Sequence, residues 1–499
     1  MEYLQTYRNY WKELSHIENI LATLHWDLEV MLPEAGYEER AEQISYLSTL
    51  YHKKYISVEL DDLMGNLALQ LESADLEPQE KFFLKRELEV LSRERNRAKK
   101  LPEIWVKEFS KLTNLAHGIW AEAKQKKDFS HFSPTLKKIV AMVQEKAELY
   151  GYTTEPYDAL LEDYETGTKA SDLEKLFVHL KNSLIPFINQ FQTFPNPFQK
   201  KIAKELQANF CSKLPPMLGL PKNSYRLDVS LHPFSTSLGA NDKRITTRYF
   251  ENEPFSSVFG VLHETGHALY EFGLKDMKGY PSALSVALSY GIHESQSRLW
   301  ENQVGRSRPF WEYLYPTLLK EFNIYHYDLP FDKLYNYINS VSKSKIRVEA
   351  DQVTYNLHII LRFEIERDLL SKKITVDELP QIWNENMKKF FDLEIENDAE
   401  GVLQDVHWSG GSFGYFPTYT LGNIYAAQLF HTFLDTHQSF WEDVRTRGDF
   451  SSLLKWLKKN IFQLGKLYSP KELIKQATGE EPNSNYLIKY LKGKMRELG

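Results

Sequence analysis

The sequence VLHETGHALYEFG, residues 261–273, carries two histidines four positions apart, with a glutamate directly after the first. Apolar residues recur at three- and four-residue spacing from about residue 255 to residue 272, which predicts a helix. Positions four apart lie on one face of a helix, so His263 and His267 would point their imidazoles at one place. Glu264 would project about 100° around the helix axis, beside that place. This pattern is typical of two metal ligands with a neighbouring general base, although a helix with two ordinary histidines has the same spacing.

Helical spacing of apolar residues runs through most of the chain, as in KLTNLAHGIWAEAKQ (111–125) and QVTYNLHIILRFEIERDLL (352–370). Proline and glycine breakers separate these segments, and we find no internal repeat or low-complexity linker. We therefore predict a mainly α fold, with one large helical domain over residues 1–499. Its expected parts are a mostly helical amino-terminal part (1–224), a β-hairpin (225–250), the metal and substrate site (251–430) and a helical carboxy-terminal part (431–499).

One stretch departs from the helical pattern. In YRLDVSLHPFSTSLGANDKRITTRYF, residues 225–250, alternating and β-branched residues flank a Gly-Ala-Asn-Asp turn. This pattern predicts a small antiparallel β-sheet just before the helix that carries the histidines. A strand there could pair with an extended peptide along a groove, and a purely structural hairpin is the alternative.

Composition excludes several classes of protein. The formal net charge of −7 implies no basic face for nucleic acid. A single cysteine, Cys211, excludes a disulfide framework and fits a reducing compartment. The amino terminus lacks a signal-peptide pattern, and no apolar run approaches 18 residues, so we expect no membrane span and a cytoplasmic location.

A hydrolytic zinc site needs a third protein ligand and an open fourth position for water. The downstream segment SALSVALSYGIHESQSRLWEN, residues 282–302, is predicted to form a second helix that could run back past the first. Glu294 could complete a His, His, Glu site. His293 is the rival in the same tripeptide, and spacing does not exclude it.

Six motifs together resemble one known family. HETGH and HESQ are preceded by HPF (232–234) and DKRIT (242–246), and are followed by IRVEAD (346–351) and GVLQDVHW (401–408). In this order they look like the motifs of the carboxypeptidase Taq family of zinc metallocarboxypeptidases. The amino-terminal third, with LHWD (24–27), is also similar, so the resemblance covers nearly the whole chain.

The resemblance implies a helical body with a long deep groove, the metal at its floor and a small sheet along one wall. It also implies a homodimer that removes single carboxy-terminal residues from peptides with broad specificity. By the family's pattern the ligands of Zn²⁺ are His263, His267 and Glu294, and the general base is Glu264. Co²⁺ or Mn²⁺ could substitute, because His, His, Glu suits several divalent ions.

Further site residues are expected from a similarity to related helical zinc peptidases and from side-chain chemistry. His407 and Tyr419 would stabilise the oxyanion of the reaction, and Tyr415 between them would contact the substrate or pack as an aromatic residue. Arg347 is the favoured partner of the substrate carboxylate, because a guanidinium binds a carboxylate through two parallel hydrogen bonds. Arg244 is the competitor, with a structural pair to Asp242 as the alternative. Two further residues, Asp351 and Asp405, could orient histidines of the site.

Two other functions stay open. A related helical zinc oligopeptidase or peptidyl-dipeptidase would use the same metal ligands with a different groove. A non-enzymatic helical interaction protein could carry HExxH by accident, although a binding scaffold has no need of Glu264 beside two histidines. Metal content and the length of the released product distinguish these functions.

Overall fold

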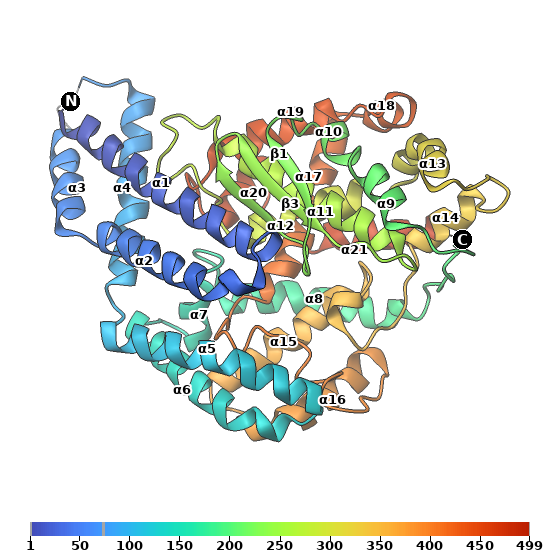
Figure 1. Ribbon diagram of the computed structural model, residues 1–499, viewed down its shortest axis with the longest axis horizontal. Helices are drawn as coiled ribbons and strands as arrows, with labels where there is room; N and C mark the ends of the chain where they lie inside the picture. The colour runs from blue at the N-terminus through green and yellow to red at the C-terminus, as the bar shows by residue number, and fades with distance from the viewer. Residues whose placement is uncertain (1, 72–74, 499) are drawn as a thin grey trace.

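The computed structural model describes residues 2–71 and 75–498. Its architecture is mainly helical, as predicted, with a small sheet between two groups of helices (Figure 1). The helices before the sheet are α1 (Glu2–Val30), α2 (Tyr37–Tyr55), α3 (Val58–Leu71), α4 (Pro78–Ala98), α5 (Glu103–Lys126), α6 (Ser133–Tyr150), α7 (Pro156–Leu161), α8 (Ala170–Ile188), α9 (Lys204–Cys211) and α10 (Leu214–Met217).

The helices after the sheet form the centre and the carboxy-terminal side of the molecule. They are α11 (Pro254–Leu274), α12 (Tyr290–Arg298), a π-helical turn (Leu299–Val304), α13 (Arg308–Phe322), α14 (Phe331–Ile338), α15 (Thr354–Leu370), α16 (Leu379–Phe391), α17 (Pro417–Thr436), α18 (Phe440–Arg447), α19 (Ser451–Asn460), α20 (Pro470–Thr478) and α21 (Asn485–Glu497).

One large hydrophobic core runs through the molecule from α4 to α21. α11, α15 and α17 are buried on nearly all sides. α11 and α17 are mostly apolar around the helix, whereas α15 also buries polar side chains such as Arg362 and Glu366. A second, smaller core joins α1, α3 and α4 at the amino-terminal end. The central helices therefore form a rigid frame, and they carry the residues discussed below.

The sheet comprises β1 (Tyr225–Val229), β2 (Ser235–Gly239) and β3 (Asp242–Thr247), in the order β1-β3-β2. β2 and β3 form the predicted antiparallel hairpin. The prediction of a purely antiparallel sheet is wrong, because β1 pairs with β3 in parallel. The connection from β1 to β2 crosses the carboxy-terminal end of β3. There the Ser230 hydroxyl donates to the hydroxyl oxygen of Thr246 (2.6 Å), and the Phe234 amide donates to the same oxygen (2.9 Å). Alternation predicts a strand but not its neighbour.

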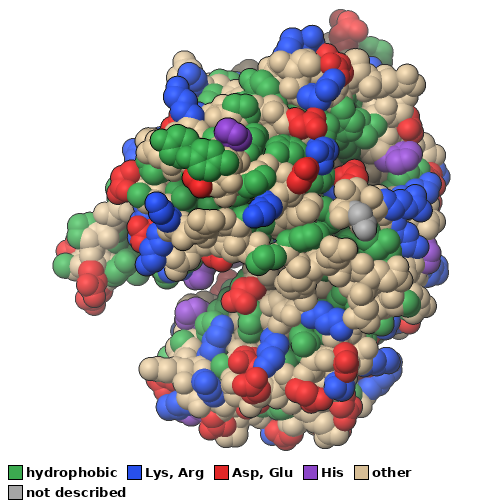
Figure 2. Space-filling view, turned by 90° about the vertical axis from the view of Figure 1, so that its right-hand side faces the viewer, with side chains coloured by type: hydrophobic (Ala, Val, Ile, Leu, Met, Phe, Trp, Pro, Cys, Tyr) green, Lys and Arg blue, Asp and Glu red, His purple; other side chains and the backbone are tan. Residues whose placement is uncertain are grey.

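A space-filling view shows a hollow on one face, between a larger upper part and a smaller lower part (Figure 2). Figure 1 places α5, α6 and α16 in that lower part. A hollow of this kind is compatible with the groove that the family resemblance implies, whose role as a substrate groove stays a prediction.

Candidate metal centre and active site

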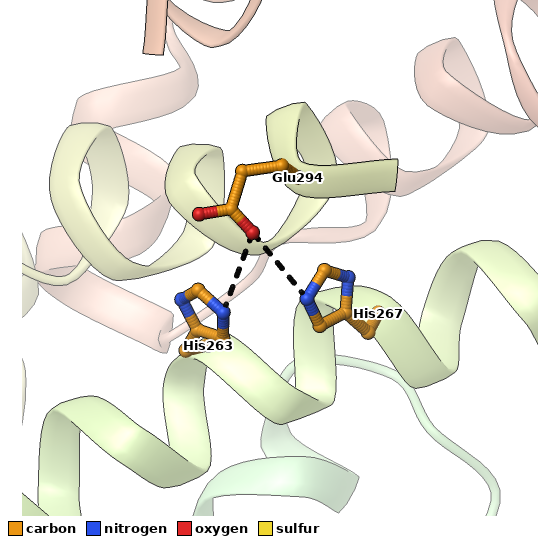
Figure 3. A group of neighbouring side chains, drawn as sticks. All are labelled: His263, His267 and Glu294. Atoms are coloured by element: carbon orange, nitrogen blue, oxygen red, sulfur yellow. Dashed lines mark ion pairs between the residues drawn. The ribbon is translucent and has the colours of Figure 1, made fainter. Parts of the chain in front are cut away.

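The three expected ligands meet at one point between α11 and α12 (Figure 3). His263 and His267 lie one turn apart on α11, and Glu294 reaches them from α12. Oε2 of Glu294 is 3.6 Å from Nε2 of each histidine. Ligand atoms about 2.1 Å from a tetrahedral zinc ion stand about 3.4 Å apart, so these side chains fit such an ion. Within residues 2–71 and 75–498, no other group of three His, Cys, Asp or Glu side chains converges in this way.

Two glycines allow the helices to approach closely enough to place Glu294. A Cβ on Gly266, inside HETGH, would lie 2.5 Å from the backbone oxygen of Gln296 in α12. A Cβ on Gly422 in α17 would lie 2.5 Å from Cγ of Glu294 itself. α12 is therefore held between α11 and α17, and a side chain at either glycine would displace the ligand.

The predicted helix over residues 282–302 begins later than expected, since α12 starts at Tyr290. Local serine contacts account for the difference. The Leu284 amide donates to the Ser282 hydroxyl (3.1 Å), and the Ser282 amide donates to the Ser285 hydroxyl (2.8 Å). Such side-chain bonds to the backbone compete with helical hydrogen bonds. Ser289 then caps α12 by accepting from the Ile292 amide.

Two charged residues that the sequence analysis missed hold the ligands in place. Glu301, in the π-helical turn, accepts a hydrogen bond from Nδ1 of His263 (2.9 Å), which leaves Nε2 for a metal. Arg298 donates to Oε1 of Glu294 (2.6 Å) and to Oε2 of Glu301 (3.1 Å). Glu294 therefore presents Oε2 to the histidines. The spacing of Glu294, Arg298 and Glu301 along one helix face was the signal that could have found them.

Replacing Glu301 with Gln is expected to weaken metal binding about 10-fold to 100-fold, the usual range for a residue that orients a ligating histidine. The charge behind His263 is lost, whereas an oxygen remains to accept its proton. Competition with a chelator measures the affinity. Glu271→Gln is the matched control, because Glu271 bonds His293 and none of the three ligands. Wild-type affinity in Glu301→Gln would contradict a role in tuning the metal.

Electrostatics at the centre favour a positive charge. Burial lowers the pKa of His263, but Glu294 and Glu301 outweigh burial and raise it to about 9. Glu264 lies beside the ligands and is 7% exposed. Burial raises its pKa to about 7, which His263 opposes and Glu294 reinforces. A divalent cation bound there would displace the proton from Nε2 of His263. Its positive charge would also lower the pKa of Glu264 and favour the ionised carboxylate.

His293, the rival ligand, points elsewhere. Its Nε2 lies 3.0 Å from Oε1 of Glu271, and its ring packs against that of His267 at an interplanar angle of 33°, with centroids 4.3 Å apart. The structure thus places His293 beside the group of three, where it packs against one ligand.

The expected oxyanion residues form a second cluster at the start of α17. Nε2 of His407 lies 3.2 Å from the Tyr419 hydroxyl oxygen, and the rings of Tyr415 and Tyr419 are 5.3 Å apart. Tyr419 stands one turn before Gly422, whose backbone packs on Glu294, so the cluster lies next to the metal ligands. Burial lowers the pKa of His407 to about 4, so its imidazole is neutral at neutral pH.

Comparison with known proteins identifies the family. The model of the carboxypeptidase Taq (M32) metallopeptidases matches residues 6–495. The chain belongs to this family. It is therefore a metallocarboxypeptidase, a peptide hydrolase of the exopeptidase type, and the resemblance found in the six motifs is confirmed.

The M32 relatives align over nearly their full length. Carboxypeptidase 1 of Bacillus subtilis (strain 168) is 38% identical over 496 residues, which cover 98% of this chain and 97% of the relative. Thermostable carboxypeptidase 1 of Pyrococcus furiosus is 38% identical over 498 residues, with the same coverage of 98% and 97%. The crystal structure of the M32 carboxypeptidase from Deinococcus radiodurans R1 is similar with a TM-score of 0.95 at 33% identity, covering 100% of this chain and 99% of that one.

The two candidate arginines of this M32 chain occupy different surroundings. Arg347 lies beside the oxyanion cluster, with its guanidinium carbon 5.2 Å from the Tyr419 ring. Its Nε donates to Asp405 (2.9 Å), and its Nη1 donates to the Tyr355 hydroxyl (3.0 Å). Arg244 instead forms two hydrogen bonds to Asp242 (2.6 and 2.9 Å), which is the structural pairing considered as its alternative.

The aspartates expected to orient histidines bind other groups in this M32 chain. Asp405 pairs with Arg347 (2.8 Å) and with Arg362 (2.5 Å). Asp351 accepts from the amides of Val353 (2.8 Å) and Thr354 (3.1 Å), at the start of α15. Glu301, rather than either aspartate, takes the place behind His263.

In residues 2–71 and 75–498, every helix of the M32 chain is too short or too polar to span a lipid bilayer.

Proposed function

We propose that this chain is a zinc-dependent carboxypeptidase that releases single carboxy-terminal amino acids from peptides with broad side-chain preference. The observation that carries the proposal is the convergence of His263, His267 and Glu294 with Glu264 beside them. Two imidazoles and one carboxylate oxygen form the ligand set of catalytic zinc, and Co²⁺ or Mn²⁺ are possible substitutes with the same donors. Zinc in such a site acts as a Lewis acid on the scissile carbonyl and supplies hydroxide at neutral pH.

Glu264 serves as the general base. Its position beside the ligands allows it to take a proton from the attacking water and to pass that proton to the leaving amine. Burial of this carboxyl keeps its proton affinity high enough for both steps, because desolvation disfavours the charged form.

His407 and Tyr419 stabilise the oxyanion. A neutral imidazole and a phenol are both hydrogen-bond donors, and burial keeps each of them in its uncharged form at neutral pH. Their contact uses one of these two protons. With Nε2–H of His407 as the donor, His407 orients Tyr419 and leaves the phenolic O–H for the oxyanion. Such preorganised donors act on the charge that develops in the transition state. Tyr415, packed against Tyr164 and Tyr290, forms the neighbouring wall for the substrate.

Arg347 binds the free carboxylate of the substrate. Nε and Nη1 donate to Asp405 and Tyr355, and Nη2 also faces Asp405 at 2.8 Å. Each Nη holds two protons, so one N–H on each remains for a carboxylate beside Tyr419. Asp405 fixes the guanidinium plane, which favours a two-point contact.

The carboxylate contact predicts that one short peptide is hydrolysed as the free acid and resists hydrolysis as the amide. Arg347→Gln is expected to lower kcat/KM for the free acid about 10-fold to 100-fold, corresponding to a charged hydrogen-bond pair of about 1.5–3 kcal/mol. Arg244→Gln tested on the same peptide decides between the two arginines. A loss confined to Arg244→Gln would transfer the carboxylate contact to Arg244.

The released product tests the alternative function. Single amino acids support the carboxypeptidase, whereas dipeptides or cleavage of the amide would indicate a related oligopeptidase or peptidyl-dipeptidase. The homodimer and the cytoplasmic location remain predictions from the family resemblance and from the composition.

A further inference from the structure

Glu366, on α15, is a fully buried carboxylate outside the metal centre, with 0% of its surface exposed. It accepts three hydrogen bonds, one from α7 and two from residues 408–414. The Tyr157 hydroxyl of α7 donates to Oε2 (2.8 Å), the Trp408 indole donates to Oε1 (2.9 Å), and the Gly414 amide donates to Oε2 (3.0 Å). Throughout the described ranges, no Lys, Arg or His lies within salt-bridge distance of this carboxylate.

Two of the three donors mark the ends of one turn, residues 408–414. Trp408 directly follows His407, and Gly414 directly precedes Tyr415. Glu366 therefore binds both ends of the segment that separates these two site residues. Few side chains can do this, because a carboxylate accepts bonds on two oxygens in several directions.

The turn is also held from its other sides. Gly414 has φ +88°, and a Cβ there would lie 3.2 Å from the backbone of Leu160 in α7. One turn before Glu366 on α15, Arg362 donates to Gln404 and Asp405, both 2.7 Å away. α15 thus fixes the stretch of chain before His407 through Arg362 and the turn after it through Glu366.

Stability alone does not account for a carboxylate at this position. A charge buried among neutral donors carries a desolvation cost that an apolar side chain avoids. What the carboxylate adds is direction, since its two oxygens fix where an indole N–H and a backbone N–H must lie.

We propose that Glu366 is a positioning residue, which holds the 408–414 turn so that His407 and Tyr415 face the metal ligands. It acts mainly on turnover through His407, has a smaller effect on substrate affinity through Tyr415, and leaves the metal content unchanged. The inference rests on the proposed roles of His407 and Tyr415.

Glu366→Gln tests the inference with the least change in volume. The amide oxygen still accepts from Tyr157 and Gly414, but the amide nitrogen then faces the Trp408 N–H, donor against donor. We expect kcat to fall about 10-fold to 100-fold, the size of effect that misplacement of about 1 Å produces, with a smaller change in KM and with bound metal within about twofold of the wild type. Wild-type kcat in Glu366→Gln would overturn the inference, even with a lower Tm.

Tyr157→Phe is the matched control. It removes one hydrogen bond from the same carboxylate, on the side that does not belong to the turn, and kcat should stay at the wild-type value. Trp408→Phe removes one bond on the side of the turn, and kcat should fall. This pair carries the test if Glu366→Gln does not fold, and equal kcat values in the pair would overturn the inference.

The double variant Glu366→Gln with Trp408→Phe removes the donor that the amide would face. In the Trp408→Phe protein, Glu366→Gln should therefore change kcat at most about threefold. In the wild-type protein, the same substitution should lower kcat about 10-fold to 100-fold. His407→Ala separates the two proposals. Loss of turnover there with wild-type turnover in Glu366→Gln overturns the role of Glu366 alone, whereas wild-type turnover in both overturns the role of His407 as well.

Discussion

Replacing Glu264 with Gln lowers kcat by about 10²-fold to 10⁴-fold, the range that one general acid–base group contributes, while the metal stays bound. The amide keeps the shape of the side chain but takes up no proton from water at neutral pH. His263, His267 and Glu294 are unchanged in this variant, so the metal site keeps its donors. Steady-state hydrolysis of a short free-acid peptide measures kcat, and elemental analysis of the same sample measures the metal.

Glu271→Gln is the control for this prediction. Glu271 lies two turns later on α11, is half-buried and bonds His293. The same chemical change there should leave kcat near the wild-type value. Near-wild-type turnover in metal-loaded Glu264→Gln would contradict the assignment of the general base, and loss of metal in that variant would mean that Glu264 supports the ligands.

Replacing Glu294 with Ala abolishes metal retention and with it the hydrolysis of peptides. The two histidines remain, but the carboxylate oxygen 3.6 Å from both is lost, and two imidazoles alone do not form the three-ligand set of catalytic zinc. Metal content after dialysis against a weak chelator and activity before and after added Zn²⁺ are the measurements. The Tm of each variant reports whether α12 still packs between α11 and α17.

His293→Ala is the matched partner, one position away on the same helix. It leaves Glu271 without its hydrogen bond, just as Glu294→Ala leaves Arg298 without one of its own. Metal content should stay at the wild-type level in His293→Ala. The reverse pattern, with metal lost in His293→Ala and kept in Glu294→Ala, would make His293 the third ligand.

The pair of histidines could be predicted because the relevant information is local. Helical periodicity predicted α11, and a spacing of four residues places His263 and His267 on one face whatever surrounds the helix. The strands were visible for the same reason, since alternation is a property of a short segment. The parallel pairing of β1 with β3 could not be predicted in this way. The contacts that hold the β1–β2 connection across the end of β3, from Ser230 and Phe234 to Thr246, form only when the sheet is assembled.

The choice between His293 and Glu294 was beyond the spacing alone. Both residues lie within reach of α11, and the rotation of α12 decides which of them points at the histidines. Gly266 and Gly422 make room for α12 in the orientation that points Glu294 at the histidines, because a side chain at either position would clash with α12. The family resemblance selected Glu294 as the ligand but did not explain why α12 points it at the histidines.

The sequence by itself determined the helical class, the two histidines, the adjacent base and, through six motifs, the family. Only the tertiary structure decided which groups support the site. Glu366 meets Trp408 from 42 residues away and Tyr157 from 209 residues away, and these contacts join α15 to a loop and to α7. Periodicity records which face of a segment is buried, but it carries no trace of which distant donor a buried carboxylate meets, because chain packing alone brings the two together.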